Sequence, residues 1–272
     1  MAYKDILAVV ASHEEECVFQ AADALARQGD GHVAVVHLSE LPAMLIDPMG
    51  AATSAWVAFA ERMREEAVAE CEKIKERLRR SAALTELRSL ESASALVAGD
   101  VAKQALHADV TIMQTPSNEF VQGAFEGALF QSGRPVLLMP KSWRGDSLGE
   151  NVLIAWKPVR EAARAVADAL PFIAAATKVS VLTVDAKPDG YAQGPGRDIA
   201  THLARYGANV EVRNADGLGR FAEEAILAEA KAVNADLIVL GGYGHGRLTE
   251  FVFGGVTRAL SRTSPIPVFM SH

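Results

Sequence analysis

A glycine-rich segment near the C-terminus has the residue types and spacing of a ligand-binding loop. Gly241, Gly244 and Gly254 follow a strand-like apolar run, and a helical pattern begins at Gly255. Glycine lets the main chain adopt positive φ angles and approach a ligand closely, and free N–H groups at a loop or helix start can hold a phosphate. The segment predicts a phosphate-binding loop, with a turn that only connects strand to helix as the structural alternative.

Two side chains near this segment could assist a bound phosphate. His245 lies within the glycine-rich stretch, where its imidazole could donate a hydrogen bond or respond to pH. Lys157 follows the strand-like run 151–156, and its ammonium could pair with a phosphate. Each is equally compatible with an exposed loop residue, so we treat both as optional phosphate partners.

Elsewhere the sequence shows no recognisable catalytic or metal-binding set. The seven histidines are scattered, and there is neither a nucleophile elbow nor a G-x-x-x-x-G-K-S/T loop. Cys17 and Cys71 lie 54 residues apart, with neither metal-ligand spacing nor a disulfide framework, which favours buried free thiols. Ser12 and Glu15 fit a helix capping box, so we interpret the neighbouring carboxylates as structural. We therefore expect no catalytic residue and no metal.

The elements that must position the glycine segment occur twice along the chain. Ala108–Met113 matches Ala235–Leu240 at an offset of 127, and Pro135–Met139 matches Pro267–Met270 at 132. Strand-length runs lie at 4–10, 32–38, 84–89, 109–114, 135–139, 151–156, 178–184, 208–213, 236–241 and 267–270. Continuous apolar runs are typical of strands buried on both faces of a parallel sheet. The predicted fold class is α/β, with two tandem Rossmann-like, doubly wound parallel sheets.

The repeat divides the chain into an N-terminal domain, 1–141, and a C-terminal domain, 150–272, joined by a polar linker. The first copy has about 19 extra residues in its middle, where apolar side chains recur every three or four residues from Ser54 to Arg80. This pattern predicts a long amphipathic helix that covers its own sheet, with partner binding as the alternative. The partly apolar segment 41–53 before it could be a lid, an interface or ordinary packing.

The spacing of the glycine segment resembles the G-x2-G-x9-G-S/T nucleotide loop of the universal stress protein family. That family's closing helix, Pro-containing turn and last strand have counterparts here in Thr257–Arg262, Ser264–Pro267 and Val268–Met270. The resemblance covers the whole chain as two copies, so the chain is similar to the family's tandem form. It implies a stress-response binding or regulatory protein rather than an enzyme, with ATP or a related adenine nucleotide as the ligand.

The C-terminal copy departs from the family pattern at two places. Gly255 stands where the family has a phosphate-contacting Ser or Thr, although Thr257 lies on the same first turn. The acidic residue that usually follows the first strand is replaced by Lys157, and by Ala11 in the N-terminal copy. The resemblance therefore implies a weaker nucleotide site, formed by Gly241, Gly244, Gly254 and the helix start at 255–257.

The N-terminal copy is not expected to bind ATP. The positions that match Gly241 and Gly244 hold Gln114 and Ser117. Only the third glycine of the pattern is kept, as Gly127. Three consecutive carboxylates, 14–16, would also repel an anion. Because each copy ends in a short apolar strand with an otherwise exposed edge, we expect the copies to pair as an intrachain pseudo-dimer. A homodimer of the whole chain is an open alternative.

Charge and hydropathy exclude two classes of partner. Residues 1–146 carry 14 basic and 21 acidic side chains, and residues 147–272 carry 13 of each, which together give the net charge of −7. Neither half has the basic surplus of a nucleic-acid-binding protein. No apolar run approaches the roughly 18 residues of a membrane span, and the N-terminus is unlike a signal peptide, so we expect a cytoplasmic location.

An ATP-using enzyme of a related α/β fold is the alternative function, and it would need an acid or metal ligand near the loop.

Overall fold

The computed structural model describes residues 2–41, 54–81, 84–145, 147–185, 196–216, 221–242 and 255–272. The N-terminal half contains β1 (Asp5–Val10), α1 (Glu16–Gly29), β2 (His32–Leu41), α2 (Ser54–Leu78), β3 (Leu84–Ala93), α3 (Val97–Ala105), β4 (Val110–Gln114), α4 (Glu119–Gln131) and β5 (Val136–Met139). The C-terminal half contains β6 (Asn151–Ala155), α5 (Arg160–Asp168), α6 (Leu170–Ala175), β7 (Lys178–Val184), α7 (Arg197–Ala204), β8 (Val210–Ala215), α8 (Ala222–Ala232), β9 (Leu237–Gly241), α9 (Gly255–Thr263) and β10 (Val268–Ser271).

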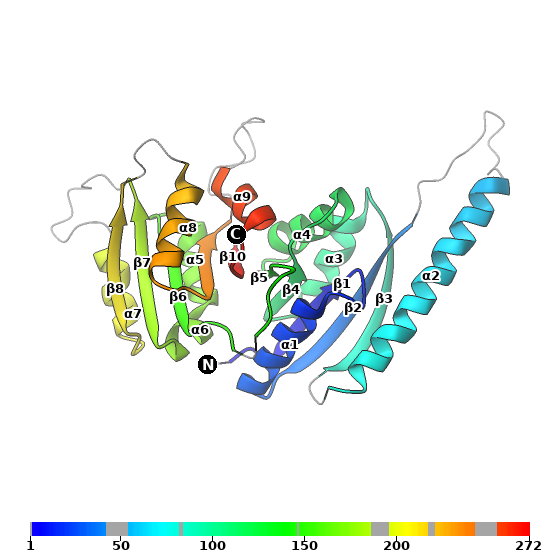
Figure 1. The fold of residues 1–272 in the computed structure, drawn as a ribbon, viewed down its shortest axis with the longest axis horizontal. Helices are drawn as coiled ribbons and strands as arrows, with labels where there is room; N and C mark the ends of the chain where they lie inside the picture. The colour runs from blue at the N-terminus through cyan, green and yellow to red at the C-terminus, as the bar shows by residue number, and fades with distance from the viewer. Residues whose placement is uncertain are drawn as a thin grey trace.

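All ten strands form one continuous sheet, in the order β3-β2-β1-β4-β5-β10-β9-β6-β7-β8 (Figure 1). Neighbouring strands are parallel everywhere except at the centre, where β5 and β10 pair antiparallel. The order within each half is the same when read outward from this central pair. The predicted α/β class is confirmed, and so is the expectation that the closing strands of the two copies meet.

Helices cover both faces of the sheet because its strands are apolar on both sides. In β9, Leu237 and Val239 join the core beneath α1, α5, α6 and α7, whereas Ile238 and Leu240 join the core beneath α3, α4, α8 and α9. All four side chains have 4% or less of their surface exposed. This two-sided burial explains why the strands are continuous apolar runs without polar alternation.

The join between the halves is closed by an aromatic cluster as well as by backbone pairing. The Phe172 ring lies 5.4 Å from the Tyr3 ring and 5.8 Å from the Phe269 ring, measured between centroids. The Tyr3 hydroxyl donates to the backbone oxygen of Asp168 at 2.8 Å. Residues from both halves therefore share one core, and the two copies are not separated units on a linker.

Helix α2 follows the predicted amphipathic seam, but it covers the sheet over only part of its length. Ile74 and Leu78 near its C-terminal end are buried, whereas Val57 and Phe59 near its start are 42% and 44% exposed. In Figure 1, α2 lies beside β2 and β3 at the outer end of the N-terminal half. The prediction that the helix covers its own sheet is thus confirmed at Ala60, Ile74 and Leu78, which are buried, while much of the surface of its first turns remains exposed. Segment 42–53, which the sequence offered as a lid, lies outside the described residues.

The capping box predicted at the start of the first helix is wrong. Helix α1 begins at Glu16, so Glu15 itself stands at the N-cap and makes no side-chain cap. The Ser12 hydroxyl instead accepts from the N–H of Glu14 at 3.1 Å, and the Glu15 carboxylate accepts from the N–H of Ala11 at 3.1 Å. The two side chains close the loop after β1, and the helix starts three residues later than the pattern indicated. Among the described residues, no helix is both long and apolar enough to cross a membrane.

Candidate functional site

The structure describes only the two ends of the predicted glycine loop. Gly241 closes β9, Gly242 follows it, and Gly255 opens α9. Gly244, His245 and Gly254 lie outside the described residues, as part of segment 243–254. The site is therefore defined by the elements that enter and leave the segment.

Gly241 is needed for packing whether or not a ligand binds. A Cβ atom at this position would lie 2.5 Å from the backbone nitrogen of Ala162 and 2.6 Å from the carbonyl carbon of Glu161. No side chain fits at such a distance, so glycine is what allows the start of α5 to approach the end of β9. The next N–H, that of Gly242, donates to the backbone oxygen of Ser271 at 2.7 Å. It is thus engaged in the sheet rather than free for a phosphate.

After the undescribed segment, the first turn of α9 contains one exposed residue, Gly255, and one buried residue, Thr257. Gly255 is exposed, and a Cβ atom there would meet no heavy atom within 4 Å. Thr257 has only 4% of its surface exposed. The backbone at Gly255 is therefore open, whereas the Thr257 side chain one half-turn later is packed.

Lys157 lies at the same edge of the sheet as the glycine segment. Strands β6 and β9 pair in parallel through Ala155 and Leu240, and Lys157 and Gly242 each follow two residues after these partners. The Lys157 side chain is exposed. The structure thus brings a cation and the predicted loop, 84 residues apart in sequence, to adjoining strand ends.

A buried carboxylate at the start of α5 was missed by sequence reasoning. The Glu161 side chain is 7% exposed and pairs with the Nε atom of Arg160 at 2.5 Å. Burial opposes its ionisation, but the hydrogen bonds from Arg160 and from its own backbone, with the charge of Arg160, lower the pKa of Glu161 below its usual value. Its burial depends on the close approach of α5 to β9, a feature that no local pattern signals.

Most of the segment of the N-terminal copy that matches the glycine loop lies in helix α4. Asn118 caps α4, its side chain accepting from the N–H of Val121 at 2.9 Å. Gly127 lies inside this helix, where a Cβ atom would be 2.0 Å from the carbonyl oxygen of Ala98 in α3. The interpretation of Gly127 as a surviving loop glycine is therefore wrong, because this glycine allows α3 and α4 to cross closely.

The loop after β1 in this copy is covered by a carboxylate from α2. Glu70 accepts from the Ser12 hydroxyl at 3.1 Å and from the N–H of His13 at 2.5 Å, and it pairs with His13 Nδ1 at 2.5 Å. Although burial opposes ionisation, these hydrogen bonds lower the pKa of Glu70 to about 2. Burial raises the pKa of nearby Glu15 to about 7. The loop after β1 corresponds to the residues after β6 in the C-terminal half. In the N-terminal half this place is thus occupied by the acidic side chains of Glu15 and Glu70.

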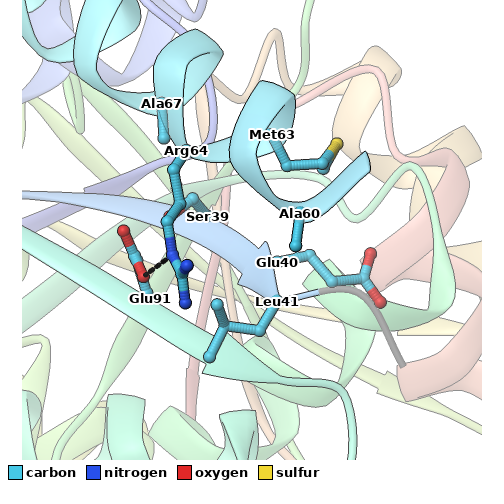
Figure 2. A pocket seen from close by; sticks show the side chains of 8 residues that line it. All are labelled: Ser39, Glu40, Leu41, Ala60, Met63, Arg64, Ala67 and Glu91. Carbon is cyan, nitrogen blue, oxygen red and sulfur yellow. Dashed lines mark ion pairs between the residues drawn. The ribbon is translucent and has the colours of Figure 1, made fainter. Parts of the chain in front are cut away.

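A small pocket lies between α2 and the ends of β2 and β3, and Figure 2 shows its lining. Its lining includes Met63 and Ala67 of α2 and Leu41 of β2, and Arg64 of α2 pairs with Glu91 of β3 at 3.9 Å. Because this pocket belongs to the outer end of the N-terminal half, it is separate from the glycine segment.

Comparisons with known proteins relate these features to one family. The model of the universal stress protein family matches residues 150–272. A universal stress protein from Archaeoglobus fulgidus DSM 4304 is 22% identical, with a TM-score of 0.67 over 98% of this chain and 95% of its own. A Pseudomonas aeruginosa UCBPP-PA14 protein, provisionally described as a universal stress protein, is 17% identical, with a TM-score of 0.62 over 99% and 93%. These two structures share the fold of the whole chain, and no curated protein matches it.

Proposed function

Because residues 150–272 belong to the universal stress protein family and the N-terminal half repeats their fold, we propose that the chain is a stress-response binding or regulatory protein. Its ligand in this proposal is ATP or a related adenine nucleotide, bound in the C-terminal half alone. The role is one of binding rather than catalysis. The site consists of Gly241, Gly244, Gly254, Gly255 and Thr257, with Lys157 and His245 as optional phosphate partners.

The observation that supports this proposal is the position of the glycine segment at a switch point of the sheet. From β6 the chain moves outward to β7, and it later returns on the other side of β6 to form β9. In parallel α/β sheets, ligands bind outside the carboxyl ends of two strands related in this way. Lys157 follows β6 and Gly242 follows β9, so this cation and the start of the glycine segment lie at that edge.

The matching edge of the N-terminal half supports binding in one half only. Strands β1 and β4 form its switch point, and Glu15 and Glu70 lie at the loop after β1. A triphosphate there would have to displace Glu70 from three hydrogen bonds and approach its ionised carboxylate. In the C-terminal half, the corresponding residue after β6 is the exposed cation Lys157.

Calorimetric titration of the full chain with ATP and magnesium tests the proposal. Gly244→Val adds a side chain where the phosphate must approach, so we expect it to reduce affinity at least tenfold. The control is Ser117→Val, which makes the same change at the matching position of the N-terminal copy and should leave affinity unchanged. Undiminished binding by Gly244→Val, or no binding by the unmutated chain, would overturn the proposed site.

A further inference from the structure

Helix α2 brings a cysteine close to a histidine in the middle of β2. The Nδ1 atom of His37, in β2, lies 3.1 Å from the Sγ atom of Cys71, in α2. Only 2% of the His37 surface is exposed, whereas Cys71 is partly exposed. The expectation that both cysteines are buried is therefore wrong for Cys71, because this part of α2 rests at the margin of the sheet. Cys71 is thus partly open to solvent, and the imidazole beside it is buried.

The surroundings of His37 suit it to accept a proton from this thiol. Burial lowers its pKa, so the ring is neutral at neutral pH and has a nitrogen lone pair. The charge of Glu70 and a hydrogen bond with the Ala11 backbone act in the opposite direction and favour the protonated ring. Glu70 is itself kept ionised by Ser12 and His13. An imidazolium formed by proton transfer would thus have a carboxylate and a backbone partner nearby.

We propose that Cys71 is a site of oxidative modification, with a hydroperoxide as its reactant and His37 as the group that accepts the thiol proton. The S–H proton moves to the imidazole, and the thiolate attacks one oxygen of the peroxide. An S–O bond forms as the O–O bond breaks, so sulfur loses two electrons and the peroxide gains them. The departing oxygen takes the proton from the imidazolium, giving a sulfenic acid and water, or an alcohol from an organic hydroperoxide.

The second cysteine provides an internal control of opposite character. Cys17 is 1% exposed, and its thiol lies 3.5 Å from the Gln114 side-chain oxygen. Burial raises the pKa of Cys17 to about 11. This thiol lacks both the exposure and the basic partner of Cys71, so we expect it to remain reduced while the chain is folded.

The two thiols can be followed separately in the full-length protein. Trypsin releases Cys71 in the peptide 65–73 and Cys17 in the peptide 5–27. The folded chain is treated with hydrogen peroxide and a sulfenic-acid trap, and the labelling rate of each peptide is compared with that of the chain unfolded in urea. We expect folding to increase the rate at Cys71 about tenfold or more and to suppress labelling of Cys17. Labelling of Cys71 in the folded chain no faster than in the unfolded chain would overturn the proposal.

Replacement of the imidazole separates the role of His37 from simple exposure of the thiol. We expect His37→Gln, with its fold checked by circular dichroism, to lower the Cys71 rate about tenfold or more, because general bases contribute at least this much. Lys75→Gln, at an exposed ion pair one turn along α2, is the matched control and should leave the rate unchanged. An unchanged rate in folded His37→Gln would contradict the assignment, and if that variant does not fold, the comparison of folded with unfolded wild type decides the proposal alone.

Discussion

The close crossing of α3 and α4 predicts opposite effects for the same substitution at two helical glycines. Gly99 lies in α3, where an added Cβ atom would meet no heavy atom within 4 Å. Gly127 lies in α4, where the added atom would be 2.0 Å from the carbonyl oxygen of Ala98. Both changes replace glycine by alanine within a helix, so the gain in helix propensity is nearly the same at the two positions. The difference between the two variants therefore reports the surroundings of each glycine.

The magnitudes follow from these distances. Gly99→Ala should stabilise the protein by about 0.5–1 kcal/mol, the usual gain when alanine replaces glycine in a helix. At Gly127 the same gain is opposed by an overlap with backbone, which cannot rotate away as a flexible side chain can. Relieving such an overlap requires the two helices to separate, and overpacking of this kind costs typically about 1–3 kcal/mol or more. We therefore expect Gly127→Ala to be less stable than wild type.

Urea unfolding followed by circular dichroism measures both variants against wild type. The expected order of the free energy of unfolding is Gly99→Ala, then wild type, then Gly127→Ala. If Gly127→Ala proved as stable as Gly99→Ala, the close α3–α4 crossing would be refuted, and with it the explanation for a glycine at this position. A loop rather than a helix around Gly127 would be the simplest way to obtain that result.

Two further predictions concern the join and the acidic loop. Phe172→Ala should lower the free energy of unfolding by about 3–5 kcal/mol, because the 3% exposed ring packs on Tyr3 and Phe269, whereas Phe221→Ala, at a 72% exposed ring, should change it by less than about 0.5 kcal/mol in urea unfolding. The raised pKa of Glu15, about 7, means that the folded state holds this proton more tightly than the unfolded state, so its contribution falls as pH rises from about 4.5 through 7. Urea unfolding at pH 5 and pH 8 should therefore show that Glu15→Gln becomes more stable relative to wild type at the higher pH, and a difference independent of pH would argue against a raised Glu15 pKa.

The sequence alone was sufficient to predict the strands and their division into two copies. Strands such as β1, β7 and β9 begin or end within one residue of the predicted positions, because a run of apolar residues signals burial on both faces wherever it occurs. The closing strands were also correctly expected to meet, since 136–139 and 268–271 would otherwise be exposed edges. These features depend on local pattern and on the general cost of unpaired strands.

The side-chain clusters were decided by tertiary structure alone. Glu70 and Cys71 appear in the sequence only as members of a long helix, and their partners His13 and His37 belong to other elements. Likewise, Gly127 matched a loop glycine by position, yet the apolar residues around it extend a helix whose crossing with α3 requires a glycine. Periodicity records which face of an element is buried, but not which distant element lies against it. That information arises only when long-range packing places the helices on the sheet.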